Sequence, residues 1–138
     1  MSVAIYPGSF NPFHEGHEDV LQKALKVFDK VIIATGYNPQ KGHPIEIPED
    51  KERELKRKYP GQVNFLSFSG LLVNVVEDSK VDAVIRGLRN GHDLQYEMNL
   101  QYHNEDLGLK VPVVYFVTDR KLCHISSSAI RELRRFKV

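Results

Sequence analysis

The stretch VAIYPGSFNPFHEGH at residues 3–17 contains, in order, a strand, a loop and the beginning of a helix. Its first part, Val3–Tyr6, is a short apolar run of the kind found in buried strands. Glycine, proline and asparagine then interrupt the run at residues 7–12, as expected of a loop. Across His17–Phe28, apolar residues recur every three or four positions, which predicts an amphipathic helix. A strand followed directly by a helix is typical of α/β folds.

The same alternation continues along the rest of the chain. Further runs rich in β-branched residues predict strands at Val31–Thr35, Val63–Phe68, Val81–Ile85 and Val111–Val117. Helices are expected at residues 49–59, Leu71–Ser79, Leu94–Leu107 and Ser127–Phe136. This order indicates a doubly wound, Rossmann-like α/β fold, with a mainly parallel five-stranded sheet and helices on both faces. Ligands bind beyond the carboxyl ends of the strands in such folds, so the loops there are candidate site segments.

Length and composition fit a single domain over residues 1–138. Hydrophobic residues make up 41% and charged residues 27% of the chain, as in ordinary globular proteins. The net charge of +1 argues against a general nucleic-acid binder. No apolar stretch approaches the ~20 residues that span a bilayer, and the N-terminus does not resemble a signal peptide. With a single cysteine that excludes an internal disulfide, we expect a cytoplasmic protein that binds neither membranes nor nucleic acid.

The loop between the first strand and the first helix carries the strongest chemical signal. Its glycines allow the backbone to approach a ligand, and the N-terminus of the helix favours an anion. His14 and His17 could donate hydrogen bonds to the oxygens of that anion. Two incidental histidines in a loop are the alternative, but this turn is where the fold places ligands. The loop therefore predicts a phosphate site.

Two further segments place phosphate-binding groups after later strands. Arg86 and Arg89 follow the fourth strand, and guanidinium groups form paired hydrogen bonds with phosphate. Solvated salt bridges are the alternative for these arginines. The serines at residues 126–128 precede the last helix, where serine is a preferred N-cap residue and can also bind phosphate. Together these segments favour a phosphate site built from several strand ends.

Other side chains have simpler interpretations. Lys41 lies in a loop rich in proline and glycine, from which its ammonium group could reach a ligand, although alone it would be a solvated lysine. For Tyr96 and Glu97 we expect a buried tyrosine and a surface glutamate. Arg131 and the other basic residues near the C-terminus are expected to complement the dipole of the last helix.

These segments resemble the nucleotidyltransferase superfamily that carries a His-x-Gly-His signature, which is His14–His17 in this chain. Within it, the most similar pattern is that of the phosphopantetheine adenylyltransferase family. The resemblance runs from Ile5–Phe10 through Ile85–Arg89 and Tyr96–Glu97 to Ile125–Ser128. It covers nearly the whole chain in the expected order, and four matched segments are more specific than one.

The resemblance implies transfer of the adenylyl group of ATP to 4'-phosphopantetheine, which gives dephospho-coenzyme A and pyrophosphate by in-line attack without a covalent intermediate. His17 would stabilise the transition state at the α-phosphate, and Lys41 would lie between that group and the acceptor phosphate. The residues implied to bind ATP are Ser9, Phe10, His14, His17, Arg89, Glu97, Ser126, Ser127 and Ser128. Those implied to bind the acceptor are Ser9, Lys41, Leu72 and Arg86. Mg²⁺ would be bound with ATP, and protein side chains that ligate a metal are not expected.

Some positions depart from the family pattern. His14 stands where the family usually has threonine, and Asn11 replaces the usual aspartate, so that this loop is more similar to nicotinate mononucleotide adenylyltransferases. A nicotinate or nicotinamide mononucleotide acceptor is therefore one alternative, and a nucleotide-binding module that has lost catalysis is another. The family usually forms hexamers, which implies a homo-oligomer, although the segment after Ser128 is shorter than is usual in the family.

Overall fold

A five-stranded parallel sheet forms the centre of the chain, of which the computed structural model describes residues 1–37, 40, 47–122, 124 and 126–135. The strands lie in the order β3-β2-β1-β4-β5, and each neighbouring pair is parallel. Their bounds are β1 (Val3–Gly8), β2 (Lys30–Gly36), β3 (Val63–Phe68), β4 (Ala83–Leu88) and β5 (Val113–Val117). The predicted Rossmann-like fold is confirmed, and its sheet is parallel throughout.

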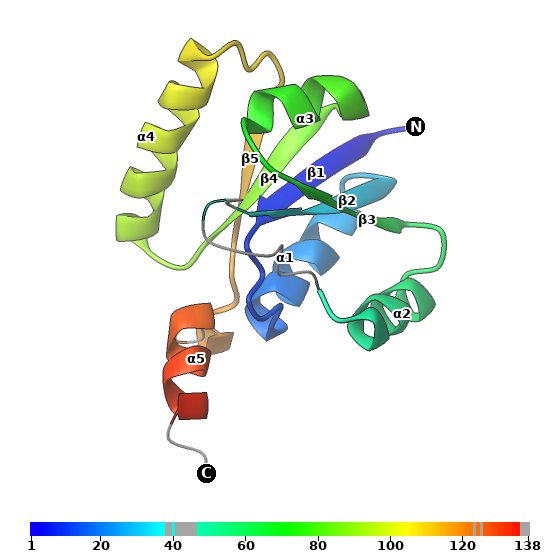
Figure 1. Cartoon of the computed structure of the whole chain (residues 1–138), viewed down its shortest axis with the longest axis vertical. Coiled ribbons are helices and arrows are strands. Elements are labelled where there is room, and N and C mark those ends of the chain that lie inside the picture. The colour runs from blue at the N-terminus through cyan, green and yellow to red at the C-terminus, as the bar shows by residue number, and fades with distance from the viewer. Residues whose placement is uncertain (38–39, 41–46, 123, 125, 136–138) are drawn as a thin grey trace.

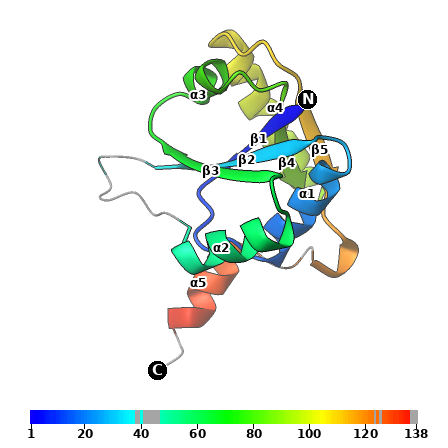
Figure 2. The same ribbon diagram turned by 90° about the vertical axis from the view of Figure 1, so that its right-hand side faces the viewer.

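Helices cover both faces of the sheet (Figures 1 and 2). They are α1 (Glu15–Leu25), α2 (Glu49–Lys58), α3 (Leu72–Ser79), α4 (Gly91–Asp106) and α5 (Ser127–Arg135), with a short 3-10 helix at Arg120–Leu122. One buried cluster joins Leu21 of α1 and Leu55 of α2 to the sheet, and a second joins Val73 of α3 to the opposite face. Because side chains alternate along a strand, Ile5 and Tyr6 belong to different clusters. Within the described residues, no helix has the length and apolar character needed to cross a membrane.

Two helices begin earlier than the sequence predicted because side chains cap them. Helix α1 starts at Glu15, and its N-cap His14 accepts a hydrogen bond from the backbone N–H of Gly16 at 3.1 Å. Helix α4 starts at Gly91, where Oδ1 of its N-cap Asn90 accepts from the N–H of Asp93 at 3.0 Å. Apolar periodicity does not report such caps, so it placed both starts too late.

Strands β1 and β4 separate toward their carboxyl ends. They pair only at Ala4 with Ala83 and at Ile5 with Val84, whereas β1 pairs with β2 along its full length. The two strands also flank the point at which the chain reverses its direction across the sheet. Ligands of doubly wound folds bind at such a switch point, so the separation of β1 and β4 opens the sheet where a site is expected.

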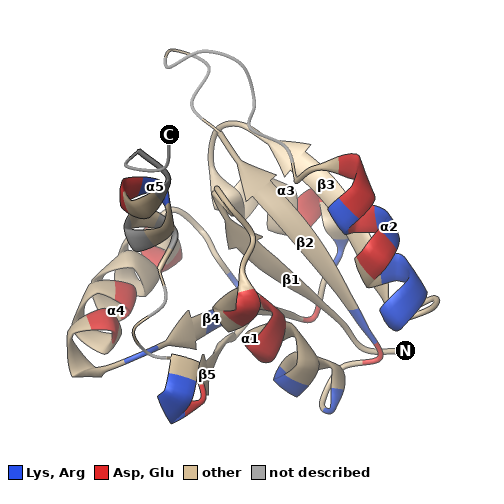
Figure 3. Cartoon of the chain, turned by 90° about the horizontal axis from the view of Figure 1, so that it is seen from below, with Lys and Arg blue, Asp and Glu red and all other residues tan. Residues whose placement is uncertain are grey.

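Helix α4 is attached to the sheet by a charged residue and not by an apolar stripe. Glu97 is only 7% exposed and is the buried residue of this helix, whereas Tyr96 is 66% exposed. The prediction of a buried tyrosine and a surface glutamate was therefore wrong. Elsewhere the pattern is ordinary, since Figure 3 shows charged residues mainly on the helices, with acidic and basic side chains mixed along α2.

Candidate active site

Two cavities adjoin beyond the carboxyl ends of β1 and β4. Their volumes are about 380 Å³ and about 350 Å³. The first, here called the polar pocket, is lined by charged and hydroxyl side chains that include His14, His17, Arg89, Ser126, Ser128 and Arg131. The second, here called the apolar pocket, is lined mainly by Phe68, Leu71, Leu72, Leu100, Leu107 and Leu109. The residues common to both linings, which form the wall between the pockets, are Pro7, Gly8, Ser9, Arg86 and Glu97.

Two histidines cap the start of α1 with their ring nitrogens. Nδ1 of His14 accepts from the N–H of Gly16, and Nδ1 of His17 accepts from the N–H of His14, both at 3.1 Å. The two rings stack with their centroids 3.8 Å apart. An Nδ1 that accepts a hydrogen bond carries no proton, so the proton of each neutral ring lies on Nε2. Because both rings line the polar pocket, each can offer an Nε2–H donor to a ligand there.

The surroundings of His17 keep its ring neutral. Burial, together with electrostatic interactions with His14, Arg86 and Arg89, lowers the pKa of His17 to about 3. Burial also lowers the pKa of His14. The rings of Phe10 and Phe13 lie 4.9 Å and 5.3 Å from the ring of His17, centroid to centroid. At neutral pH, His17 is therefore suited to donating a hydrogen bond and not to taking up a proton.

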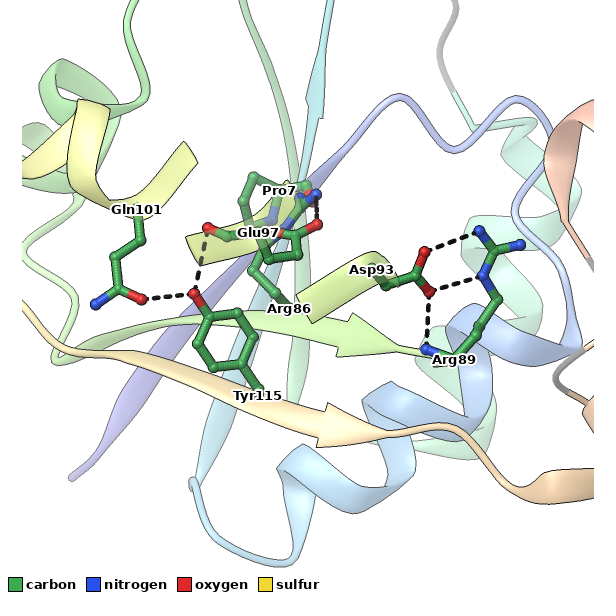
Figure 4. A network of polar contacts seen from close by, with 7 residues as sticks. All are labelled: Pro7, Arg86, Arg89, Asp93, Glu97, Gln101 and Tyr115. Carbon is green, nitrogen blue, oxygen red and sulfur yellow. Dashed lines mark hydrogen bonds and ion pairs between the residues drawn. The ribbon is translucent and has the colours of Figure 1, made fainter. Parts of the chain in front are cut away.

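Arg89 and Asp93 form an ion pair at the polar pocket (Figure 4). Nε of Arg89 donates to Oδ2 of Asp93 at 3.0 Å, and Nη2 donates to Oδ1 at 3.3 Å. The backbone N–H of Arg89 also donates to Oδ2 at 2.9 Å. Partial burial raises the pKa of Asp93, but the hydrogen bonds from Arg89 outweigh this effect and lower it overall. The pair fixes the end of β4 against the first turn of α4.

Arg86 connects β4 with β1 and α4 (Figure 4). Its Nη1 donates to the backbone oxygen of Pro7 at 2.6 Å. Its Nε and Nη2 donate to Oε2 and Oε1 of Glu97, both at 2.8 Å. Burial alone would lower the pKa of Arg86, but the hydrogen bonds and charge of Glu97 raise it above its usual value. A permanently charged guanidinium group thus lies in the wall between the two pockets.

The structure brings together most of the residues that the sequence predicted for the site. Those predicted for ATP that line the polar pocket are Ser9, Phe10, His14, His17, Arg89, Glu97, Ser126 and Ser128. Those predicted for the acceptor that line the apolar pocket are Ser9, Leu72 and Arg86. Ser127 is the first residue of α5, and Lys41 lies outside the described residues.

Arg131 is a residue of the polar pocket that the sequence interpretation missed. Its Nη1 donates to the backbone oxygen of Asn11 at 2.6 Å, and its Nη2 donates to Oγ of Ser128 at 3.2 Å. These bonds connect α5 to the loop after β1. The spacing of Ser128 and Arg131, three residues apart in a helix, places them on one face and was the available signal. Arg131 was instead assigned to the dipole of the last helix.

The apolar pocket also contains polar groups that no motif indicated. The hydroxyl of Tyr115 on β5 donates to Oε1 of Gln101 at 2.5 Å and lies 3.4 Å from the backbone oxygen of Glu97. Both side chains line this pocket. A mostly apolar cavity with a few placed polar groups is typical of a small-molecule site.

Comparisons with known proteins show the family of the chain. Residues 5–133 match the family model described as cytidylyltransferase-like. A protein of Porphyromonas gingivalis named phosphopantetheine adenylyltransferase is 39% identical over 137 residues, which cover 98% of this chain and 88% of the relative. A protein of the same name from Clostridium beijerinckii is 38% identical over 138 residues, covering 99% and 86% respectively.

Two solved structures of other proteins have a similar fold. Pantothenate synthetase of Thermus thermophilus has a TM-score of 0.67 at 15% identity and covers 98% of this chain, with 64% of that chain matched. The lipopolysaccharide core biosynthesis protein of Thermoplasma volcanium has a TM-score of 0.58 at 22% identity, covering 86% and 98%. At these identities the likeness concerns the fold alone. Because the named relatives are 38–39% identical over nearly the full length of the chain, the chain belongs to the phosphopantetheine adenylyltransferase family and is a cytidylyltransferase-like nucleotidyltransferase.

Proposed function

We propose that this nucleotidyltransferase transfers the adenylyl group of ATP to 4'-phosphopantetheine, forming dephospho-coenzyme A and pyrophosphate. An oxygen of the acceptor phosphate attacks the α-phosphorus of ATP. The bond between that phosphorus and the oxygen bridging to the β-phosphate breaks, and pyrophosphate leaves with the electron pair. The observation that carries the proposal is the pair of adjoining pockets, one polar and one apolar, with a shared charged wall.

The polar pocket suits the triphosphate of ATP. It offers the Nε2–H donors of the two histidines, the guanidinium groups of Arg89 and Arg131, and the hydroxyl groups at the start of α5. The N-termini of α1 and α5 add positive dipole ends, which favour anions. The negative charge of the triphosphate would be shared among these donors, which follow the ends of three strands and line the same pocket.

The apolar pocket suits the acceptor. The pantetheine arm is a chain of methylene and methyl groups interrupted by amides, so it needs apolar walls and a few hydrogen-bonding groups. Leucine side chains supply the walls, and the hydroxyl of Tyr115 with the amide of Gln101 can serve an amide of the arm. With the arm in this pocket, its phosphate would reach the shared wall at Ser9 and Arg86.

Catalysis would then depend on positioning and on stabilisation of charge. A neutral His17 that donates Nε2–H to a nonbridging oxygen of the α-phosphate would bind more strongly as charge builds up on that oxygen. Arg86 would hold the acceptor phosphate on the other side of the reacting phosphorus. Lys41 stays a proposed contact between the two phosphates.

Magnesium is proposed to accompany ATP. The described residues include no group of three or more His, Cys, Asp or Glu arranged to hold a metal ion, and the carboxylates of the polar pocket, Asp93 and Glu97, already pair with arginines. This donor set fits an ion held by phosphate oxygens and water, where it would neutralise part of the triphosphate charge.

Pyrophosphate release measured with ATP and each of three acceptors tests the proposal. We expect phosphopantetheine to exceed nicotinate and nicotinamide mononucleotides by at least ~100-fold in kcat/KM, a ratio attainable when a site is shaped for one acceptor. Mass spectrometry should identify the product as dephospho-coenzyme A. Equal or higher efficiency with a pyridine nucleotide would overturn the acceptor. Calorimetric binding of ATP without pyrophosphate release from any acceptor would indicate a binding module instead.

A further inference from the structure

The ammonium group of Lys23 connects α1 to the end of β5. Its Nζ donates to the backbone oxygen of Val117 at 2.6 Å, to Oδ1 of Asp119 at 2.9 Å and to Oδ2 of Asp19 at 3.0 Å. An ammonium group has three N–H donors, so these contacts use all of them. Lys23 therefore has no donor left for a ligand, and any effect that it has on a ligand must pass through the residues that it holds.

Asp19, one turn before Lys23 on α1, holds the backbone of Asp119. The side chain of Asp19 is nearly buried, and its Oδ2 accepts from the N–H of Asp119 at 3.0 Å. Asp119 is thus bound twice, through its side chain by Lys23 and through its backbone by Asp19. Partial burial lowers the pKa of Lys23, but the hydrogen bonds and charges of the two aspartates raise it overall, so the ammonium group stays charged. These three residues are here called the clasp.

The clasp lies where the chain leaves the sheet. Strand β5 ends at Val117, and the N–H of Thr118 donates to the backbone oxygen of Leu88 at the end of β4, at 2.8 Å. The N–H of Leu122 then donates to the backbone oxygen of Asp119 at 2.8 Å, which closes the short 3-10 helix. Asp119 is therefore the anchored start of the connection from β5 to α5.

Helix α5 depends on this connection for its position. None of its described side chains belongs to either buried hydrophobic cluster, and Leu133 is 68% exposed. Figure 1 shows the helix apart from the sheet, at the lower end of the molecule. Even so, Ser126 before the helix and Ser128 and Arg131 within it line the polar pocket. A helix that buries little apolar surface must be placed by polar contacts, which here include the clasp and the bond from Arg131 to Asn11.

We propose that Lys23 is a positioning residue for the nucleotide, which acts through Asp119 to hold the pocket-lining side chains of the α5 region at the triphosphate of ATP. This inference rests on the proposed function, since it takes ATP as the occupant of the polar pocket. Among the described residues, the lining of the apolar pocket does not extend beyond Tyr115, so the clasp lies outside the acceptor's site. Without the clasp, the α5 region would have to be ordered as ATP binds, and that ordering lowers affinity.

Calorimetric binding of ATP with Mg²⁺, and separately of phosphopantetheine, tests the assignment. Lys23→Met keeps much of the apolar stem but removes the ammonium group. We expect it to weaken ATP binding at least ~5-fold and to leave phosphopantetheine binding within ~2-fold of wild type. The matched control Lys26→Met changes an exposed lysine at the end of the same helix and should alter neither affinity.

The conservative variant Lys23→Arg restores a positive charge with several donors, so it should recover at least half of the lost binding free energy of ATP. ATP affinity equal to that of wild type in a folded Lys23→Met variant would overturn the proposal. Equal weakening of both ligands, or no recovery in Lys23→Arg, would also overturn it, because the effect would then be a general loss of structure.

A second variant covers the case in which Lys23→Met does not fold. Asp119→Ala removes the exposed end of the clasp and leaves the nearly buried Asp19 paired with Lys23, so this variant should fold. We expect its ATP affinity to fall at least ~3-fold, with phosphopantetheine binding within ~2-fold of wild type. Unchanged ATP affinity would overturn the proposal. Where both single variants fold, the double variant should lose no more than the larger single loss, and fully additive losses would show that the two residues act separately.

A measurement without substrate separates this inference from the proposed function. By hydrogen exchange and mass spectrometry, peptides that contain residues 118–122 should exchange at least ~5-fold faster in Lys23→Met or Asp119→Ala than in wild type, and peptides of β3 should not change. Unchanged exchange at residues 118–122 would overturn the inference. If the exchange result holds but wild type binds no ATP, the proposed function fails and the clasp has a structural role alone.

Discussion

The polar and apolar pockets differ in how the sequence builds them. The polar pocket consists of short motifs at strand ends, such as residues 14–17 and 126–128, where neighbouring residues act together. Apart from the wall at residues 7–9 and Gly36, the apolar pocket is lined by single side chains scattered from Phe68 to Tyr115, which come together only when the chain folds. Phosphate chemistry is therefore local in the sequence, whereas the shape of the acceptor pocket is a property of the folded chain.

The largest effect should come from breaking the shared wall. Arg86→Ala leaves the buried carboxylate of Glu97 unpaired, so we expect the free energy of unfolding to fall by about 3–5 kcal/mol. Arg89→Ala should cost below about 1 kcal/mol, because its pair with Asp93 is more exposed, at 39% and 24% for the two side chains. Urea unfolding of both variants measures the difference. Equal losses would mean that the Arg86–Glu97 pair stabilises the fold no more than the Arg89–Asp93 pair does.

In the polar pocket, the second test removes the Nε2–H donor of the neutral His17 ring. Asn at position 17 can place its Oδ1 where Nδ1 of His17 accepts, but it has no donor at the position of Nε2. We therefore expect His17→Asn to lower kcat at least ~100-fold, about 2.7 kcal/mol of transition-state stabilisation, while the KM for ATP stays within a few-fold. His17→Gln, which can return a donor near that position, should recover part of the loss. A folded His17→Asn variant with nearly normal kcat would remove His17 from its proposed role.

The polar pocket depends on the close approach of α1 to β4, because Val20 and Gly87 both line it. A Cβ atom on Gly87 would lie 2.7 Å from Cγ2 of Val20, which is nearer than side chains pack. Gly87→Ala should therefore lower the free energy of unfolding by about 1–3 kcal/mol, the usual cost of overpacking. The paired variant Gly87→Ala with Val20→Ala should recover part of it in thermal unfolding. No recovery would mean that Val20 is not the obstacle.

A smaller effect should appear as a dependence of stability on pH. The unfolded chain takes up a proton at His17 below about pH 6.5, but the folded ring, with a pKa of about 3, does not. Lowering the pH from about 6.5 toward 3 thus progressively favours unfolding. Between pH 7 and pH 5, wild type should lose on the order of 1–2 kcal/mol more than His17→Asn in urea titrations. Equal losses would contradict a buried neutral ring.

Most of the fold could be predicted from the sequence because the strands are short segments rich in apolar residues, separated by helices in a regular order. The elements were placed in the correct order, and β3 was predicted with its observed bounds, Val63–Phe68. The starts of α1 and α4 were missed because they depend on side-chain caps at His14 and Asn90. These capping hydrogen bonds do not affect the spacing of apolar residues, from which the helices were predicted.

Site residues could be predicted only where they are neighbours in the sequence. Motif residues of the polar pocket were found, but Arg131 was assigned to a helix dipole. Glu97 was named for the pocket only through the resemblance. Its own sequence position predicted a surface residue, because neither its pairing with Arg86 nor its burial follows from spacing. For the acceptor side, the sequence named Leu72 by resemblance and could not show that α4 closes a pocket around it.

The claim that each pocket serves one substrate is tested most directly by steady-state kinetics with both substrates varied, on one variant from each side. Leu72→Trp reduces the space of the apolar pocket, so its KM for phosphopantetheine should rise at least ~10-fold and its KM for ATP should stay within ~3-fold. Arg89→Ala should give the reverse pattern, through the loss of a charged hydrogen bond. If either variant instead raised both KM values equally, or if Leu72→Trp affected ATP alone, the assignment of the two pockets would be contradicted.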